Sequence, residues 1–324
     1  SPRQPLMKPA NLHIVEVGPR DGLQNLSVFV PTDRKADLIR RLAACGVREI
    51  QAGAFVNPRA IPQFRDMKEV MADVCDLRDC GVVLSTLVPN LQGARDAVEA
   101  GVSKLDFFFS VSRSHNLNNV RQTPEESLAA LRLVLGEFDQ APGLSFRVNL
   151  ATVFGCPFEG YLETAAILEH VEKTARLGIR EITLCDTVGW GYPAQVEAIL
   201  KACLAAFPEV AFGVHLHNTR GLGLANALKA WETGIRVFDS ALGGLGGCPF
   251  APGASGNVAT EDLLFLFQSM GVSTGIDLDG ILETASFLQE ILPDTPLTSS
   301  LFRAGPPRKV PFGIEGGGKP GCES

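Results

Sequence analysis

The feature that most constrains the fold is a repeated alternation of short apolar segments with longer segments of helical periodicity. The predicted strands are Leu12–Val17, Val47–Gln51, Val82–Leu87, Lys104–Ser110, Ser145–Ala151, Ile179–Leu184, Val210–Leu216 and Val237–Leu242. The predicted helices are Thr32–Cys45, Leu91–Ala100, Pro124–Phe138, Leu162–Leu177, Pro193–Ala206 and Leu222–Glu232. Continuous apolar runs are typical of parallel strands that are buried on both faces. Eight such units in roughly 250 residues predict an α/β fold, the (β/α)8 TIM barrel.

Glycines at the helix-to-strand joints support this repeat. Gly46, Gly101, Gly178 and Gly234 each follow a predicted helix and precede a β-branched residue, as expected for left-handed helix ends. A doubly wound open sheet is the alternative, but no GxGxxG motif follows the first strand. We expect a barrel domain over residues 8–300, with extra helices at Asp262–Gly271 and Gly280–Leu292. Residues 301–324 are rich in Pro and Gly and predict a flexible C-terminal tail.

Charge and cysteine content exclude several classes of function. The net charge is −7, no Lys/Arg block is present, and no apolar run reaches the roughly 20 residues of a membrane span. We therefore expect no nucleic-acid partner and no membrane association. The eight cysteines show no CxxC spacing, which favours a reducing, cytoplasmic location without a disulfide framework.

The sequence His215-Leu216-His217 ends an apolar run and predicts a metal site. Residues i and i+2 of a strand point to the same face, and neutral imidazole is a common metal ligand. Each histidine could instead hydrogen-bond the strand end. Asp21 after the first strand and Asn257 after the eighth would complete a mixed N/O ligand set at the same barrel mouth. That set suits Mg²⁺ or Mn²⁺ better than structural zinc.

Three further side chains at the predicted strand ends carry candidate catalytic chemistry. Arg20 is placed to hydrogen-bond a developing oxyanion, although it could be an ordinary surface charge. Asp186 ends the sixth strand. Cys248 lies in the glycine-rich loop Gly243–Asn257, which could act as a lid, and there it is either a proton donor or acceptor or a neutral filler.

Several long motifs together resemble one known family. Val15–Asn25 is similar to the opening signature of 3-hydroxy-3-methylglutaryl-CoA lyases, which belong to a superfamily of barrel metallolyases. The loop Gly246–Asn257 with Ala259–Asp262 resembles the loop that separates these lyases from the related synthases. Gly155–Gly160 and Asp186–Gly189 resemble further family segments. The likeness extends from about Leu12 to Leu292.

The resemblance implies a function and a role for each candidate. Asp21, His215, His217 and Asn257 would hold a divalent cation, and Arg20 would stabilise the enolate oxygen of departing acetyl-CoA. Cys248 and Asp186 would take part in proton transfer. The implied reaction is retro-Claisen cleavage of an acyl-CoA substrate by a homodimer. A condensing synthase or aldolase, and a non-catalytic acyl-CoA-binding barrel, are the alternatives.

The chain departs from the lyase pattern at three places. Where the lyases have an acidic residue followed by Thr-Thr-Ser-Phe, this chain has Gln51-Ala52-Gly53-Ala54-Phe55. Asn218 replaces the Asp of His-x-His-Asp, and Phe107–Asn119 is closer to the synthase pattern. We expect these changes to alter the accepted acid, with citramalyl-CoA as one alternative to hydroxymethylglutaryl-CoA. Our candidate substrate or specificity residues are Gln24, Gln51, Ser112, His115, Asn218 and Glu261.

Overall fold

Eight parallel strands close into a barrel in chain order, so that each strand pairs with the next and β8 pairs with β1. The computed structural model describes residues 12–138, 140–246 and 256–308. The strands are β1 (His13–Glu16), β2 (Glu49–Ala54), β3 (Val83–Leu87), β4 (Lys104–Ser110), β5 (Ser145–Ala151), β6 (Glu181–Asp186), β7 (Ala211–Leu216) and β8 (Val237–Ser240). The predicted TIM barrel is therefore confirmed, with each of the eight strands near its expected place.

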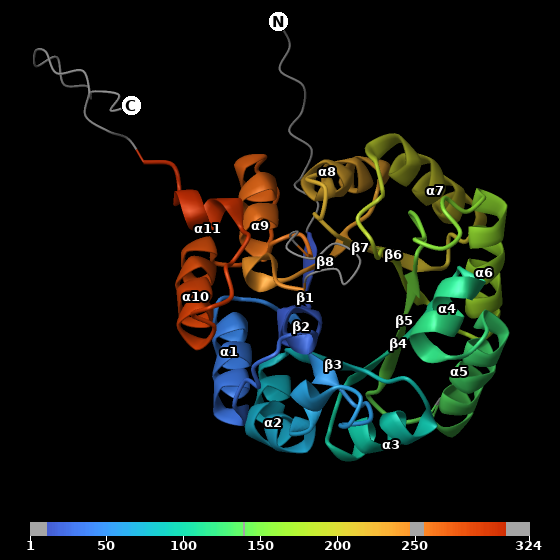
Figure 1. Cartoon of the computed structure of the whole chain (residues 1–324), viewed down its shortest axis with the longest axis horizontal. Helices are drawn as coiled ribbons and strands as arrows, with labels where there is room; N and C mark the ends of the chain where they lie inside the picture. Colours follow the sequence, from blue (N-terminus) through green and yellow to red (C-terminus); the bar gives the residue numbers. More distant parts are fainter. Residues whose placement is uncertain (1–11, 139, 247–255, 309–324) are drawn as a thin grey trace, which may run out of the picture.

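The helices form an outer ring around the strands, as Figure 1 shows. They are α1 (Thr32–Ala44), α2 (Met67–Val74), α3 (Leu91–Glu99), α4 (Arg113–Val120), α5 (Pro124–Phe138), α6 (Thr164–Arg176), α7 (Pro193–Ala206), α8 (Gly223–Thr233), α9 (Thr260–Ser269), α10 (Leu278–Ile291) and α11 (Ser300–Ala304). The sequence did not predict α2 or α4. The polar α4 begins where the Ser112 hydroxyl accepts a hydrogen bond from the His115 backbone N–H, so a cap rather than periodicity marks it.

The four joint glycines adopt the predicted left-handed conformation. Gly46, Gly101, Gly178 and Gly234 have φ values of 97°, 83°, 96° and 119°. Each turns the chain from the end of a helix directly into the next buried strand. The repeat seen in the sequence is therefore a repeat of backbone geometry.

The main hydrophobic core lies between the strands and the surrounding helices. A smaller apolar group, Val15, Val17 and Ala241, lies at the junction of β1 and β8. Elsewhere buried charges join strands that are distant in the sequence: the Arg147 guanidinium on β5 reaches Asp106 on β4 and Asp239 on β8. The interior of a TIM barrel is more often filled by branched aliphatic side chains.

The register of β2 against β3 shifts between Gln51 and Gly53. This irregularity changes the direction in which the side chains at the end of β2 point. A Cβ on Gly53 would lie 2.3 Å from the Met67 sulfur of α2, so this position packs against the outer helices. The departure from the lyase pattern at residue 53 therefore lies against a helix of the outer ring.

The C-terminal part adds helices beside β1 and β8. The two extra helices expected there are present as α9 and α10, and α11 packs against α9 (Figure 1). Helix α11 spans the predicted start of the tail at residue 301, whereas residues 309–324 lie outside the described part. Within that part, no helix is long and apolar enough to cross a bilayer.

Candidate active site

Three ligand atoms converge at the carboxyl ends of β1 and β7. The carboxylate of Asp21 and the ring nitrogens of His215 and His217 all lie within 4.8 Å of one another. The two Nε2 atoms are 3.2 Å apart, and each is 3.8–3.9 Å from Asp21 Oδ2. The backbone achieves this because β7 aims its alternate residues to one face, and because Asp21 lies on a single π-helical turn, η1 (Gly18–Gly22), directly after β1.

The charges at this cluster suit a cation. Burial raises the pKa of the Asp21 carboxyl, but the Arg20 guanidinium and the two imidazoles lower it more and hold it well below its usual range. Burial and the neighbouring His215 lower the pKa of His217 to about 4, so its ring is neutral at pH 7. The Nδ1 atom of His217 is buried without a hydrogen bond among the described residues.

Asp239 on β8 fixes the tautomer of His215. Its Oδ2 lies 3.0 Å from His215 Nδ1. Burial raises the pKa of Asp239, but the Arg147 guanidinium and His215 together hold it below its ordinary value. A carboxylate can only accept, so Nδ1 carries the proton and the lone pair of Nε2 faces His217 and Asp21. His215, His217 and Asp21 therefore face a common space, and their donor atoms fit a divalent cation there.

Asn257 joins the cluster through the backbone as well as its side chain. It forms a β-bridge with His217, and its Nδ2 donates to Asp21 Oδ2 at 2.6 Å. Gly246 makes room for this contact, because a Cβ there would lie 2.4 Å from Asn257 Nδ2 and 3.0 Å from Asp21 Oδ2. Its φ of 95° also disfavours any other residue. An amide and a glycine thus close the cluster on the side of β8.

Arg20 lies beside the cluster with its guanidinium directed by two neighbours. Its Nη1 donates to Asp21 Oδ1 at 2.6 Å, and its Nε donates to the side-chain oxygen of Gln51. The side chain is 12% exposed. Arg20 is therefore a held donor at the mouth of the barrel and not a mobile surface charge.

Asp186 at the end of β6 is tied to the loop that follows it. Its carboxylate oxygens accept hydrogen bonds from the backbone N–H groups of Trp190 (2.9 Å) and Gly191 (3.1 Å). Burial raises the pKa of Asp186 to about 6, although these backbone donors oppose the shift. A carboxyl that titrates near neutrality is suited to proton transfer.

Two buried carboxyls hold the loops that carry these residues. Glu16 accepts from the backbone N–H groups of Gly18 and Leu242 and from the Thr260 hydroxyl. Both oxygens of Glu261 accept from the Gly243 N–H. Burial raises the pKa of Glu16 to about 7 and that of Glu261 to about 8. Glu261 therefore supports the loop after β8 through the backbone of Gly243. We expected it to contact the substrate.

The remaining specificity candidates have mostly local partners. The Asn218 side-chain oxygen accepts from the Gly223 N–H at the start of α8, and Ser112 caps α4. His115 is buried in α4, and burial lowers its pKa. Gln24 is half-buried, whereas Gln51 is fully buried and contacts Arg20. Gln51 thus contacts a predicted catalytic residue.

One predicted catalytic residue cannot be placed. Cys248 lies within residues 247–255, outside the described part of the chain. The glycine-rich loop is described on both sides of this gap, where η4 (Leu242–Gly244) and the Asn257 bridge lie next to the metal candidates. The role of Cys248 stays a prediction.

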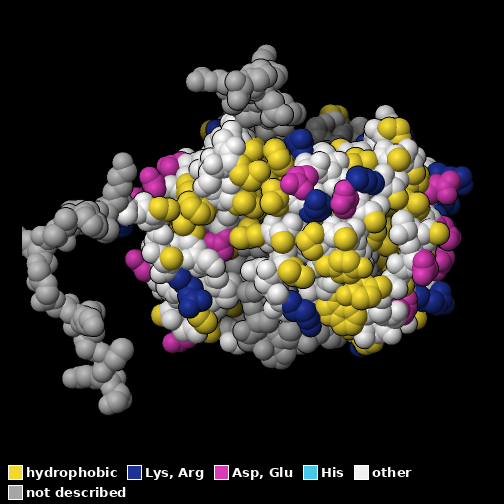
Figure 2. All heavy atoms as spheres, turned by 90° about the horizontal axis from the view of Figure 1, so that it is seen from above, with side chains coloured by type: hydrophobic (Ala, Val, Ile, Leu, Met, Phe, Trp, Pro, Cys, Tyr) yellow, Lys and Arg dark blue, Asp and Glu magenta, His cyan; other side chains and the backbone are white. Residues whose placement is uncertain are grey.

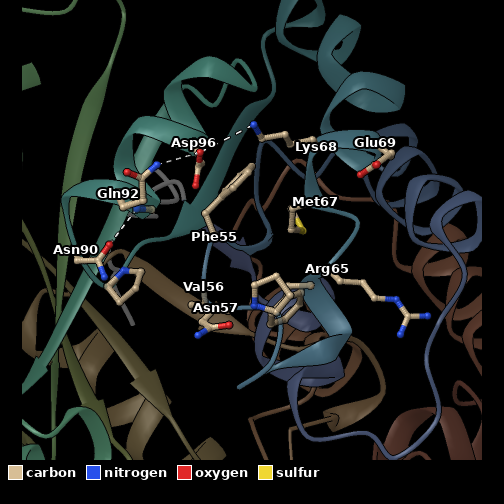
Figure 3. A pocket seen from close by; sticks show the side chains of 14 residues that line it. Phe55, Val56, Asn57, Arg65, Met67, Lys68, Glu69, Asn90, Gln92 and Asp96 are labelled. Atoms are coloured by element: carbon tan, nitrogen blue, oxygen red, sulfur yellow. Dashed lines mark hydrogen bonds and ion pairs between the residues drawn. The ribbon is translucent and has the colours of Figure 1, made fainter.

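A separate cavity of about 420 Å³ opens between α2 and α3, beyond the ends of β2 and β3. Figure 3 shows Phe55, Val56 and Met67 around it, together with the ion-paired Lys68 and Asp96. None of the predicted catalytic or metal-binding residues that the structure describes lines this cavity. It is a neighbouring feature of the barrel mouth and not the convergent site.

The sequence reasoning missed the buried charges that support the site. Asp106, Arg147 and Asp239 each lie inside a strand and are at most 5% exposed. A charged residue within a strand predicted to be buried on both faces was the available signal, because such a charge must be paired.

Comparisons with known proteins give a consistent result. The sequence profile of the HMGL-like family matches residues 11–288. Hydroxymethylglutaryl-CoA lyase YngG of Bacillus subtilis is 41% identical over 282 residues, which are 87% of this chain and 93% of that protein. The (R)-citramalyl-CoA lyase of Chloroflexus aurantiacus is 40% identical over 302 residues, covering 90% and 94% of the two chains.

A solved structure extends the likeness to the fold. An HMG-CoA lyase from Acinetobacter baumannii, in complex with coenzyme A and 3-methylmalate, superposes with a TM-score of 0.86 at 43% identity. The match covers 93% of this chain and 98% of that one.

Proposed function

The chain belongs to the HMGL-like family and is a carbon–carbon lyase of the hydroxyacyl-CoA type, and we propose that it cleaves a 3-hydroxyacyl-CoA into acetyl-CoA and a keto acid. The observation that carries the proposal is the convergence of Asp21, His215 and His217 beside the held guanidinium of Arg20. This convergence supports a cation site next to an oxyanion donor, the combination that suits the cleavage of a C–C bond beside a thioester.

We propose that these three residues, with Asn257, bind Mg²⁺ or Mn²⁺. Nitrogen and oxygen donors without thiolate favour such an ion over structural zinc. When bound, the ion would supply Lewis acidity toward the substrate hydroxyl and carboxylate. The lone pairs fixed by Asp239 and the space left by Gly246 support this assignment.

The chain's own groups would move the protons and stabilise the charge. A base takes the proton of the 3-hydroxyl, and the oxygen electrons form the C=O bond of the keto acid. The C–C bond breaks, and its electron pair goes to the thioester, where Arg20 donates to the enolate oxygen. An acid then protonates the enolate carbon to give acetyl-CoA. Asp186, with its raised pKa, is the proposed base and Cys248 the proposed acid.

Hydroxymethylglutaryl-CoA is the first proposed substrate and citramalyl-CoA the second. The chain is about equally similar to curated lyases that carry each name. The second substrate is favoured by Gln51, which puts a neutral amide where hydroxymethylglutaryl-CoA lyases carry an acid, and this amide contacts Arg20. The two substrates differ in the keto acid that is released together with acetyl-CoA.

The test is acetyl-CoA release with Mg²⁺ from hydroxymethylglutaryl-CoA and both citramalyl-CoA enantiomers. We expect rapid release from one of them, abolition by EDTA and recovery on adding Mg²⁺ or Mn²⁺. Asp21→Asn should bind the metal at least about 10-fold more weakly, because a ligand carboxylate is lost. Release that is unaffected by EDTA would contradict the metal assignment, and no release from any substrate would contradict the function.

We also propose that the enzyme is a cytoplasmic homodimer. The resemblance to the lyases supports this state, and hydrophobic side chains gather in exposed patches on the side of the molecule shown in Figure 2. Light scattering on the purified chain should give twice the mass of 34.6 kDa. A single 34.6 kDa species at micromolar concentration would contradict the proposal.

A further inference from the structure

The side-chain amide of Gln51 lies between two charged groups that allow it only one orientation. Its Nε2 donates to Asp106 Oδ2, and its Oε1 accepts from Arg20 Nε. A carboxylate can only accept and a guanidinium can only donate. Reversing the amide would place N–H against N–H on one side and oxygen against oxygen on the other.

We propose that Asp106 is a positioning residue for the lyase reaction: it fixes the Gln51 amide, and the amide in turn fixes the Arg20 guanidinium. This inference rests on the proposed function, because it concerns the donor assigned to the enolate oxygen. Asp106 is joined to Arg20 through Gln51 and acts through that amide.

Asp106 is well suited to act as the fixed point. It is fully buried, and Arg147 holds both of its oxygens, with Nε at 2.8 Å from Oδ1 and Nη2 at 3.0 Å from Oδ2. The Ser85 hydroxyl donates to the same Oδ2 at 2.8 Å. Paired donors of this planar kind restrict both the position and the tilt of a carboxylate.

The amide supplies one of two restraints on Arg20. Asp21 holds Nη1 at 2.6 Å, and Gln51 holds Nε, at the other end of the planar group. A single hydrogen bond lets a guanidinium rotate about the contact, whereas two define its plane. If the Gln51 restraint is lost, Arg20 keeps its charge and its bond to Asp21 but loses its direction.

Asp106→Asn is the primary test. An amide at 106 keeps one oxygen, so its N–H side replaces either Oδ1 or Oδ2. In place of Oδ2 it opposes Arg147 Nη2 and Gln51 Nε2, so that the Gln51 amide must reverse and direct its N–H at Arg20. In place of Oδ1 it opposes the charged Arg147 Nε and leaves Gln51 a neutral, weaker acceptor. Because the Gln51 amide no longer fixes Arg20 in either case, we expect kcat to fall about 10²-fold, with KM changed by less than about 3-fold.

Ser85→Ala is the matched control. It removes a donor from the same Asp106 oxygen but leaves the Gln51 orientation forced. We expect kcat within about 3-fold of wild type. An equal loss of kcat in both variants would mean that any disturbance of the buried charges matters, and this would overturn the proposal.

Two double variants separate positioning from general support of the barrel. In Gln51→Glu with Asp106→Asn the carboxylate moves from β4 to β2, where it accepts from Arg20 and from the new amide. We expect this pair to recover at least about 10-fold in kcat over Asp106→Asn. In a Gln51→Met background, adding Asp106→Asn should not lower kcat further, because the amide that links Asp106 to Arg20 is already absent.

The outcomes decide the proposal even if Asp106→Asn is unstable. If that single variant does not fold, the exchanged pair is the readout: folded and active supports positioning, whereas folded and inactive overturns it. If both unfold, Asp106 is structural and the proposal fails. Undiminished kcat in Asp106→Asn, or the same loss in the Gln51→Met background, also overturns it.

A measurement without substrate keeps this result distinct from the proposed function. The ¹⁵N resonance of Arg20 Nε, assigned with Arg20→Lys, should be shifted and slow to exchange in wild type and in Ser85→Ala. We expect it to move toward the free-arginine position in Asp106→Asn. If wild type cleaves no acyl-CoA but this pattern holds, the positioning stands and the reaction is wrong; if wild type is active but the resonance is unchanged, the positioning is wrong.

Discussion

Asp239 determines which nitrogen of His215 is available to a metal ion. Its carboxylate accepts from Nδ1 at 3.0 Å and leaves the Nε2 lone pair toward Asp21. In Asp239→Asn the new N–H group donates to Nδ1, and the proton moves to Nε2. We expect Mn²⁺ affinity to fall about 10- to 100-fold, measured by calorimetry.

Glu181→Gln is the control for this variant, because it removes a half-exposed carboxylate that pairs with the buried Lys104 on the same barrel. Its Mn²⁺ affinity should stay within about 3-fold of wild type. Similar affinity in Asp239→Asn and wild type would show that His215 does not bind through Nε2.

Gly246 is required for both its backbone and its lack of a side chain. A methyl group in Gly246→Ala would push against Asn257 and Asp21. We expect metal affinity and turnover to fall at least about 10-fold. Gly271→Ala is the matched control: it has a comparable φ of 79° but open space around the new Cβ. It should lose about 1 kcal/mol of stability and keep its metal affinity.

At this scale the sequence could predict the meeting of Asp21, His215 and His217, because strand alternation and the position of strand ends in a barrel are local rules. It could not predict Asp106, Arg147 or Asp239 as their support. Those contacts join β4, β5 and β8, and they depend on how deep each side chain lies in the closed barrel.

The irregular end of β2 is the element where the departures from the lyase pattern lie in different surroundings. The register shift places Gly53 against Met67 of α2, so two of the departures from the lyase pattern, at residues 51 and 53, have different consequences. One changes the neighbour of Arg20, and the other changes helix packing. Register shifts of this kind have no clear sequence signal, because glycine is compatible with both a regular and a bulged strand.

Gly53→Ser tests this separation. The added side chain overlaps the Met67 thioether, which is adaptable, so we expect a loss of about 1 kcal/mol in the free energy of unfolding. The ratio of rates with hydroxymethylglutaryl-CoA and citramalyl-CoA should not change. A shifted substrate ratio would return residue 53 to the site.

The helices show the limits of periodicity as a signal. Most of the outer ring was predictable, because each long helix buries one apolar face against the strands. The short α2 and the polar α4 were missed: α2 has only 8 residues, and α4 is defined by its cap at Ser112. Both follow strands at the active-site end, where loops and short helices vary most.

At the scale of the whole molecule, two buried carboxyls should contribute a loss of stability as the pH rises toward 8, which the lowered pKa of His217 opposes below pH 6.5. Glu16 and Glu261 have pKa values raised by burial to about 7 and about 8, from 4.5. Below pH 4.5 both states are protonated and the full contribution is present. Between pH 4.5 and 8 the unfolded chain releases protons that the folded chain retains, so folding becomes less favourable.

Glu261→Gln should remove part of this slope. Each pKa unit corresponds to about 1.4 kcal/mol, and we expect the decrease in unfolding free energy between pH 5 and 8 to become smaller by about 1 kcal/mol or more. Denaturant melts at five or six pH values would measure it. Asp262→Asn, a change at the adjacent acid, whose carboxylate accepts from Ser299 and Leu301, is the comparison. An unchanged slope in Glu261→Gln would refute the assignment.

The buried carboxylate of Asp106, between Gln51 and Arg147, limits how residues 51 and 106 can change in evolution. One negative charge fits in that region, supplied here by strand β4, and a second acid at residue 51 would meet it at contact distance. Lineages could therefore exchange the acid between the two strands only through paired substitutions, with each single step disfavoured. Among relatives, we expect acids at these two positions to be mutually exclusive, so that the pair separates branches of the family more sharply than overall identity does.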